Sequence, residues 1–117
     1  MKTIINKPWG HEEIWAQTND YVGKILFIKE GQRLSLQYHK VKEETIRVLS
    51  GTLEVIYNCQ GDGGHKYRIL NAGETFHVSP LMVHRFCASQ GTDVELIEVS
   101  TNHLHDVERL DDDYSRI

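Results

Sequence analysis

Residues 31–51 decide the fold class of this chain, and they read GQRLSLQYHKVKEETIRVLSG. A glycine stands at each end, and between the glycines lie two runs of strand length, 34–39 and 45–49. The first run alternates apolar and polar residues, and the second is rich in β-branched residues, which are two patterns typical of strands. The stretch therefore predicts two consecutive strands joined by a short turn at 40–43.

Runs of the same kind lie on both sides of this stretch, separated by glycine and polar clusters at short intervals. They cover residues 21–29, 53–57, 75–78, 83–88 and 94–99. Many short strands at near-regular spacing, with no long helical period, predict an all-β sandwich or barrel.

The tail is the one part of the chain with helix-like spacing. Val107, Leu110 and Tyr114 recur at intervals of three and four residues between Asp106 and Arg116. We expect a short C-terminal helical segment here, docked on the barrel because so short a helix is not stable alone.

Length and composition limit what the chain can be. Its 117 residues suit one compact domain, so we expect a single domain over residues 1–117. With 13 Lys and Arg against 17 Asp and Glu, the net charge of -4 gives no basic surface for nucleic acid. No apolar run reaches the ~20 residues that span a bilayer, and residues 1–10 lack a leader pattern, so we expect a cytoplasmic protein without a membrane partner. Cys59 and Cys87 match no paired motif and are expected to be free thiols.

Strand alternation predicts two different faces for residues 33–39. Successive side chains of a strand point to opposite sides of the sheet. One face is then polar, with Arg33, Ser35, Gln37 and His39, and we expect it to line the barrel interior. The other face is apolar, and we expect another sheet or a second subunit to cover it. Its residues are Leu34, Leu36 and Tyr38.

Four residues have the spacing and chemistry of a metal site. Gln37 and His39 share one strand face, and the short turn can fold Glu44 back beside them. His84 would join from a later strand if the barrel closes. Two imidazoles, a carboxylate and an amide oxygen suit Zn, Mn, Fe, Co or Ni. The alternative to metal binding is that these are ordinary surface or core residues. Gln37 has the further alternative of a hydrogen bond to the site in place of ligation.

The two glycine-framed segments resemble the paired motifs of the cupin superfamily. The first is G-x5-Q-x-H-x4-E-x6-G from residue 31, and the second is G-x5-S-x-L-x2-H from residue 73. The start Lys7-Pro8-Trp9-Gly10 and the run from Arg33 to Gln37 narrow the resemblance. From Lys7 to Arg116 the chain is similar to the type II mannose-6-phosphate isomerase cupin, often the C-terminal part of a mannose-1-phosphate guanylyltransferase.

That resemblance implies a cupin double-stranded β-helix, which is a jelly-roll barrel, and a metal held by Gln37, His39, Glu44 and His84. Zinc is the metal it favours most. It also implies a small-molecule sugar phosphate as substrate. No glycine-rich nucleotide-binding segment precedes residue 7, so the guanylyltransferase half is expected to be absent.

The chain departs from the family pattern at several positions. Ser79, Leu81 and Ala88 stand where proline, glycine and asparagine are usual. After His39 the family's further histidines, its arginine and its AEHW are missing. Lys42 keeps a positive charge where arginine is usual, but its ammonium group cannot make the two parallel hydrogen bonds of a guanidinium.

Four further residues are candidates for catalysis. The base that moves a proton between carbons is expected to be Glu98, His77 or Lys42, in that order. His77 has the alternatives of orienting a ligand or being a plain strand residue. Arg33 can reach a phosphate or an enediolate, and its alternative is an ion pair at the barrel mouth with Glu30 or Glu98. Arg85 alternates away from His84 and is expected to face outward.

Three functions compete at this point. The first is metal-dependent interconversion of mannose 6-phosphate and fructose 6-phosphate, in which a metal polarises the C1 and C2 oxygens. The second is a non-catalytic or differently catalytic metal-binding cupin that binds a sugar or sugar nucleotide. The third is an iron oxygenase, weakened because Gln37 replaces one of three expected imidazoles.

The apolar strand faces also predict an assembly. Ile25 and Phe27 alternate away from Lys24, much as Leu36 and Tyr38 alternate away from His39. One small barrel has one interior, so a second apolar face needs a cover. We expect the leading segment, with Trp9, Ile14 and Trp15, to cover part of it, and a two-fold homodimer to cover the rest.

Overall fold

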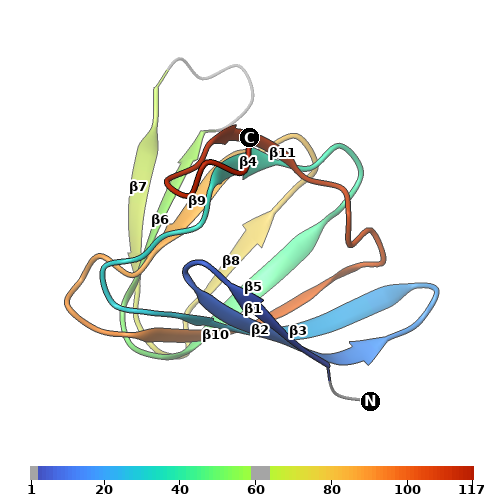
Figure 1. The fold of residues 1–117 in the computed structure, drawn as a ribbon, viewed down its shortest axis with the longest axis horizontal. Helices are drawn as coiled ribbons and strands as arrows, with labels where there is room; N and C mark the ends of the chain where they lie inside the picture. The colour runs from blue at the N-terminus through green and yellow to red at the C-terminus, as the bar shows by residue number, and fades with distance from the viewer. Residues whose placement is uncertain (1–2, 59–63) are drawn as a thin grey trace.

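The computed structural model describes residues 3–58 and 64–117 of the chain (Figure 1). Within these residues the chain forms strands and no helix. None of the described segments is therefore a helix long and apolar enough to cross a membrane. The strands are β1 Thr3–Lys7, β2 Gly10–Gln17, β3 Tyr21–Ile28, β4 Leu36–Tyr38, β5 Glu44–Ser50, β6 Leu53–Asn58, β7 Lys66–Leu70, β8 Thr75–Val78, β9 Val83–Cys87, β10 Val94–Thr101 and β11 Glu108–Asp111.

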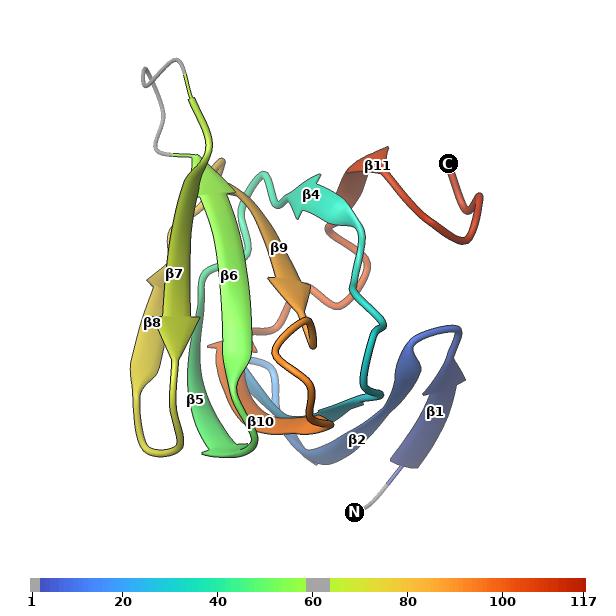
Figure 2. The same cartoon turned by 90° about the vertical axis from the view of Figure 1, so that its left-hand side faces the viewer.

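The strands form two antiparallel sheets that face each other (Figure 2). One sheet has the order β1-β2-β3-β10-β5-β8, and the other has the order β11-β4-β9-β6-β7. The pairings are nested along the chain, because β3 pairs with β10, β4 with β9, β5 with β8 and β6 with β7. A long hairpin wound in this way is a jelly roll. The all-β prediction is confirmed, and the fold is cupin-like.

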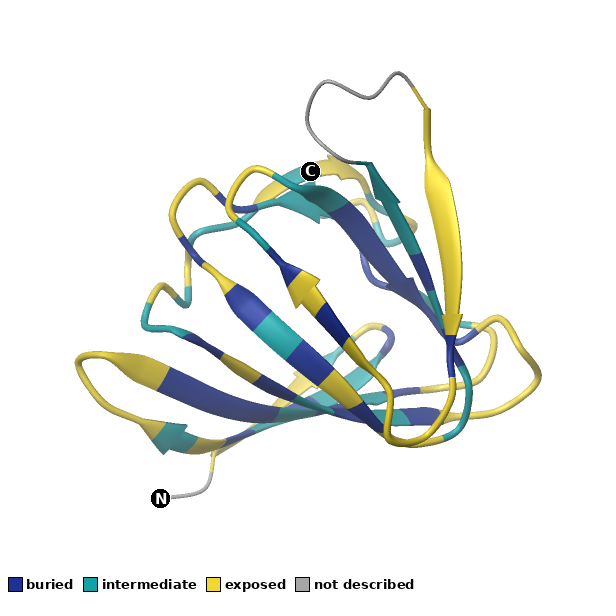
Figure 3. Ribbon diagram, turned by 180° about the vertical axis from the view of Figure 1, so that it is seen from behind, coloured by how far each residue is buried: buried dark blue, intermediate teal, exposed yellow. Residues whose placement is uncertain are grey.

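The apolar core lies between the two sheets, and alternation along each strand builds it. In β5, Ile46 and Val48 point inward while Arg47 and Leu49 are exposed. Figure 3 shows the same alternation of buried and exposed residues along several strands. The other sheet contributes Leu53, Val55 and Phe86, among others, to the same cluster. Burial of this apolar surface is the main source of stability.

The predicted strands agree with the structure to within a few residues, except that β4 is much shorter than 34–39. Four strands were not predicted, namely β1, β2, β7 and β11. Of the two predicted free thiols, Cys87 is free and buried, and burial raises the pKa of its thiol to about 11. Cys59 lies outside the described residues.

The predicted C-terminal helical segment is wrong. Glu108–Asp111 instead pairs with β4 as an edge strand, with Arg109 opposite Gln37. The acidic residues of the tail hold it there, because Asp113 accepts two hydrogen bonds from Arg33, and Asp111 one from Arg85. These interactions outweigh the spacing of Val107, Leu110 and Tyr114, which could support only a helix too short to be stable.

The predicted alternation across residues 33–39 is also wrong at its start. Only Leu36–Tyr38 form a strand, and the preceding residues make a single bridge from Arg33 to Cys87. The side chain of Leu34 therefore lies in the core and not on an outer apolar face.

Arg85 corrects a second prediction. It alternates away from His84, as predicted, but it is buried and not exposed. Its Nε donates to the carbonyl oxygen of Leu34 at 2.8 Å, and its side chain also bonds Asp111. The segment before β4 and the tail together cover it.

Candidate metal centre

Three strands and one turn bring the ligand-type residues together. His39 directly follows β4, Glu44 is the first residue of β5, and His84 lies in β9. Gln37 and His84 are direct cross-strand partners. In β5, Glu44 shares the inward face with Ile46, so strand alternation turns this carboxylate into the barrel. All three residues, His39, Glu44 and His84, are buried.

The three side chains converge on one point. Nε2 of His39 lies 3.5 Å from Oε1 of Glu44, and Nε2 of His84 lies 3.3 Å from the same oxygen. The potential ligand atoms of the three residues all lie within 4.8 Å of one another. Among the described residues, this is the one group of three or more histidine, cysteine or acidic side chains arranged in this way.

Hydrogen bonds fix the orientation of both rings. Nδ1 of His39 lies 2.5 Å from the main-chain oxygen of Asp106, and Nδ1 of His84 lies 3.0 Å from that of Met82. A carbonyl oxygen accepts only, so each ring donates from Nδ1 and turns Nε2 to the centre. Two Nε2 atoms that face a carboxylate suit a cation once they carry no proton, and this second layer of hydrogen bonds is typical of metal-binding histidines. The residues fit a divalent metal.

The electrostatics of Glu44 agree with such a site. Burial raises the pKa of the Glu44 carboxyl. Hydrogen bonds with His39 and His84 and the charge of Lys42 together lower this pKa by more, so that it lies well below its usual range. The carboxylate is therefore ionised at neutral pH, as a metal ligand must be.

The tail holds the turn that carries these ligands. The carboxylate of Asp106 accepts hydrogen bonds from the backbone N–H groups of Lys40, Val41 and Lys42, at 3.0, 2.7 and 2.9 Å. These bonds, against a smaller effect of burial, lower the pKa of Asp106 to about 2. Three donors on one carboxylate set the path from His39 to Glu44.

A second turn supports His39 from the other side. The backbone N–H of Leu81 donates to the carbonyl oxygen of His39 at 2.7 Å. Leu81 has a φ of 71°, and a 3.2 Å hydrogen bond from Met82 to Ser79 closes the turn around it. A positive φ at this place, after Pro80, is the geometry of a type II turn, which favours glycine. Leu81, which stands where the family pattern has glycine, is therefore held in a strained backbone conformation.

Gln37 lies beside the centre, in the pocket wall. Its Nε2 donates to Oγ of Ser35 at 2.9 Å. This bond leaves the amide Oε1 as the atom that can act as an acceptor or ligand.

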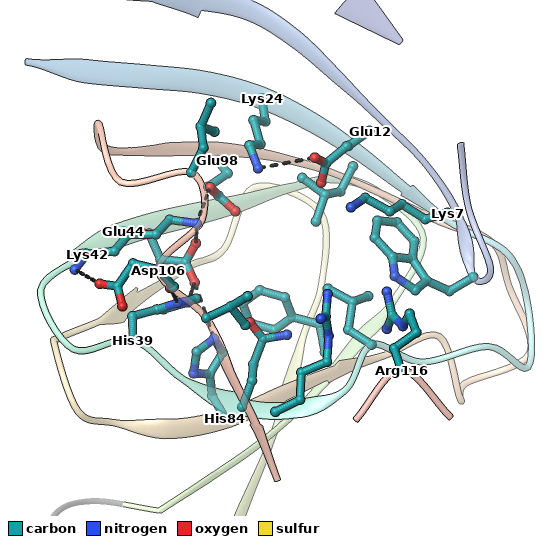
Figure 4. A pocket seen from close by; sticks show the side chains of 18 residues that line it. Lys7, Glu12, Lys24, His39, Lys42, Glu44, His84, Glu98, Asp106 and Arg116 are labelled. Carbon is teal, nitrogen blue, oxygen red and sulfur yellow. Dashed lines mark hydrogen bonds and ion pairs between the residues drawn. The ribbon is translucent and has the colours of Figure 1, made fainter. Parts of the chain in front are cut away.

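A polar pocket opens from the centre (Figure 4). Its cavity volume is about 110 Å³. Apolar residues of the wall include Trp9, Leu26, Leu34 and Phe86, and the charged ones include Glu12, Lys24, Lys42 and Glu98.

Lys42 lies between two buried carboxylates. Its Nζ is 3.4 Å from Oε2 of Glu44 and 3.2 Å from Oε2 of Glu98. Burial lowers the pKa of Lys42, but the charges of Glu98 and Glu44 raise it more, so the amine stays protonated. Burial and the charge of Glu44 raise the pKa of Glu98 to about 8, although Lys42 opposes that shift. The Oε2 atom of Glu98 is at ion-pair distance from Lys42 but accepts no hydrogen bond from the described residues.

The structure separates the other predicted site residues from this group. Arg33 does not line the pocket and instead makes a two-bond ion pair with Asp113, at 2.7 and 2.9 Å. The ion pair at Arg33 was one of its predicted alternatives, but the predicted partner was Glu30 or Glu98 and not Asp113, so that detail is wrong. His77 is exposed on β8, and its Nε2 lies 2.6 Å from Glu43, away from the pocket.

Several pocket residues were missed at the level of sequence. Lys24 and Glu12 form a buried ion pair at 3.3 Å, and Lys24 lies opposite Glu98 in the pairing of β3 with β10. Alternation along β3 puts Lys24 on the opposite face from Ile25 and Phe27, and this pattern could have predicted that Lys24 points into the barrel. Asp106, Arg109 and Arg116 enter the pocket through the tail, for which no sequence pattern predicted the path.

The fold and the site together define a cupin-type barrel with a candidate metal centre at one end of its interior. The chain belongs to the mannose-6-phosphate isomerase C-terminal family, whose model matches residues 1–112.

Curated relatives include two polysaccharide biosynthesis proteins. The alginate biosynthesis protein AlgA of Pseudomonas aeruginosa is 30% identical over 115 residues, which are 96% of this chain and 23% of the relative. The xanthan biosynthesis protein XanB of Xanthomonas campestris is 28% identical over 115 residues and is covered to 23% as well. The chain thus spans about a quarter of the length of these relatives.

Solved structures confirm the fold. The capsular polysaccharide assembling protein CapF of Staphylococcus aureus matches with a TM-score of 0.84 and 16% identity, over 95% of this chain and 34% of that one. KdgF of Halomonas sp. matches with a TM-score of 0.73 and 20% identity, over 86% of this chain and 88% of that one. At these identities the likeness concerns the fold alone.

Proposed function

We propose that the protein is a metal-dependent aldose–ketose isomerase that interconverts mannose 6-phosphate and fructose 6-phosphate. The observation that carries the proposal is the pair of Nε2 atoms held 3.3 and 3.5 Å from one oxygen of Glu44, at the inner end of a polar pocket. Membership of the family and the carbohydrate-biosynthesis names of the relatives support the choice of substrate class.

His39, Glu44 and His84 would hold the metal, with Gln37 supplying an amide oxygen. When bound, a divalent metal polarises the neighbouring sugar oxygens, and zinc is the ion that we favour for this mixed nitrogen and oxygen donor set. The fixed Nδ1 bonds of the two histidines keep these donors in place without further reorganisation.

Glu98 is the residue that we propose to move the proton between C1 and C2. It is a carboxyl group of the pocket with a buried oxygen that accepts no hydrogen bond from the described residues. The protonated Nζ of Lys42, 3.2 Å away, favours the ionised form of Glu98, which predominates above its pKa of about 8, so the proposed base is most active at mildly alkaline pH. Arg33 and His77 have no part in this proposal, because neither lines the pocket.

A coupled assay of mannose 6-phosphate isomerisation with added Zn, Mn or Co tests the proposal. Turnover is expected with at least one metal and should fall by more than about 100-fold in Glu98→Gln, the scale of a lost general base. His77→Gln is the matched control, since His77 lies outside the pocket, and it should keep full activity. No turnover with any of the three metals would remove the proposal.

The second candidate is a cupin that binds a sugar or sugar nucleotide through the same centre without turning it over. The position of Lys42 favours it, because an amine held by two carboxylates has little charge left for a substrate. Saturable binding of a sugar phosphate or sugar nucleotide without isomerisation would select this function.

A further inference from the structure

We propose that the pocket contains a subsite for an anion of the phosphate monoester class, formed by Lys7, Arg109 and Arg116. This inference rests on the proposed function, because it names the part of the pocket that would receive the phosphate of a sugar phosphate. Its evidence is separate from the metal centre.

Strand register places Arg109 in line with that centre. Arg109 of β11 pairs with Gln37 of β4, and Gln37 pairs with His84 of β9. Direct cross-strand partners point to the same face of a sheet, so Arg109 lies on the pocket side, two strands from His84. At about 4.8 Å per strand, the two Cα atoms are roughly 10 Å apart, which leaves room for a short carbon chain between metal and anion.

The guanidinium of Arg109 is incompletely satisfied. Its Nε atom is buried and has no hydrogen-bond partner among the described residues. No acidic side chain of the described residues lies within ion-pair distance of Arg109 either, although four acidic residues line the same pocket. A buried charged donor without a partner is costly, and an anion with several acceptor oxygens would satisfy it.

The charge balance of the pocket points the same way. Of its basic residues, Lys24 is paired with Glu12, and Lys42 with Glu44 and Glu98. Lys7, in contrast, has no acidic partner within ion-pair distance among residues 3–58 and 64–117. Lys7 and Arg109 therefore give this part of the pocket a positive charge that the described residues do not balance.

Arg116 is held ready at the same place. Asp112 accepts hydrogen bonds from its backbone N, Nε and Nη2, at 2.8, 2.8 and 3.0 Å. These bonds fix the direction of the guanidinium before any ligand arrives. In Figure 4, Lys7 and Arg116 lie on one side of the pocket, and His39, Lys42 and Asp106 lie on the other. The subsite is thus distinct from the metal centre but faces the same space.

Calorimetric titration with inorganic phosphate, at low ionic strength, tests the subsite. Phosphate should bind to zinc-loaded protein and also to protein stripped of metal. Arg109→Gln and Lys7→Met should each weaken binding about tenfold or more, as expected for the loss of a charge-assisted hydrogen bond. Arg47→Gln is the matched control, because Arg47 is an exposed arginine on the outward side of β5, and it should bind as the wild type does.

Two results would overturn the subsite. One is unchanged phosphate binding in both Arg109→Gln and Lys7→Met, and the other is binding that requires zinc, since phosphate would then be a ligand of the metal. Two independent variants guard against a folding defect in one of them, and Arg109→Lys should recover part of the affinity.

The subsite and the proposed function can fail separately. If isomerisation is never observed but both variants weaken phosphate binding, the subsite stands and the enzyme proposal fails. If isomerisation occurs with a KM that Arg109→Gln and Lys7→Met leave unchanged, the enzyme proposal stands and the subsite fails.

Discussion

The main-chain oxygen of Asp106 lies 2.5 Å from Nδ1 of His39, 67 residues away along the chain. The carboxylate of the same aspartate accepts three backbone hydrogen bonds from residues 40–42. One residue of the tail therefore orients a metal-type ligand and holds the turn that leads to Glu44. The tail is part of the site and not an appendage to the barrel.

Asp106→Ala should weaken both the fold and the metal centre. The three backbone donors of the turn lose their acceptor, which should lower the free energy of unfolding by about 1–3 kcal/mol. A looser turn should also lower zinc affinity by roughly tenfold, as loss of outer-layer partners does at other sites. Urea unfolding and zinc competition measure the two effects. Asp20→Ala, at an exposed aspartate, is the control, and equal zinc affinity in both variants would contradict the prediction.

Leu81→Gly should stabilise the protein. Leu81 has a φ of 71° and is 45% exposed, so its side chain sets only partial burial against the strain. Relief of a positive φ is worth about 1–2 kcal/mol, and the greater freedom of glycine in the unfolded chain costs about 0.5–1 kcal/mol. The net gain should be about 0.5–1 kcal/mol by urea unfolding.

Leu49→Gly is the matched control for that variant. Leu49 is 42% exposed but lies in β5. The same substitution should therefore destabilise the protein by about 1 kcal/mol, because glycine weakens a strand interior. Equal destabilisation by both variants would show that Leu81 is not strained.

Features of this molecule that depend on residues close together in the sequence are predicted, whereas features that depend on partners far along the chain are not. Local alternation predicts the strands, and the spacing of Gln37, His39 and Glu44 around one short turn predicts three of the four proposed ligands. The metal-type group contains three of the four predicted ligands, and Gln37 lies beside it. The prediction of a helical tail failed because the path of the tail is set by partners far along the chain, such as Arg33 for Asp113 and His39 for Asp106. The burial of Arg85 was missed for the same reason.

Acid should destabilise the tail through Asp112. Hydrogen bonds from Arg116, against a smaller effect of burial, lower the pKa of Asp112 to about 2 from an ordinary value near 3.8. The folded protein thus keeps this carboxyl ionised at a pH where the unfolded chain is protonated. Its contribution to stability is complete above about pH 5 and is lost as the pH falls to about 2.

Thermal unfolding of Asp112→Asn over this pH range measures that contribution. The variant should have a lower Tm than the wild type at pH 7, and the gap should close between about pH 5 and 2. Asp20→Asn should show no such pH-dependent gap. A gap for Asp112→Asn that stays constant with pH would mean that the ionised carboxylate is not what Arg116 stabilises.

Removal of metal should lower the thermal stability of the wild type. A ligand that binds only the folded state stabilises it by about 2.7 kcal/mol at a free concentration 100 times its Kd. Adding zinc to chelator-treated protein should therefore raise Tm by several degrees, and His84→Ala should lose most of that rise. His77→Ala, outside the pocket, should keep it. An equal rise in His84→Ala would place the bound zinc elsewhere.

The last prediction concerns assembly, for which the structure changes the expected surface. Leu36 and Tyr38 belong to one sheet, whereas Ile25 and Phe27 belong to the other, so they do not form one apolar face. The larger sheet offers the better candidate. On its outer face Val99 is 52% exposed and lies opposite Gly23, and Trp15 is 40% exposed. A Cβ at Gly23 would lie only 2.6 Å from the ring of Trp15, so glycine is what allows the indole to lie so close to the sheet.

We therefore expect a two-fold homodimer that packs these outer faces of β2, β3 and β10 against each other, burying at least ~1,000 Å² in total. Val99→Asp should dissociate it, because one charge would enter the apolar contact twice, once from each subunit. Zinc affinity should not change, since Glu98 and Ser100 face inward while Val99 faces outward. Sedimentation velocity at micromolar concentration is the measurement, with Leu110→Asp as the control at an exposed leucine of the other sheet. A monomeric wild type, or a dimer that survives Val99→Asp, would show that this face needs no partner.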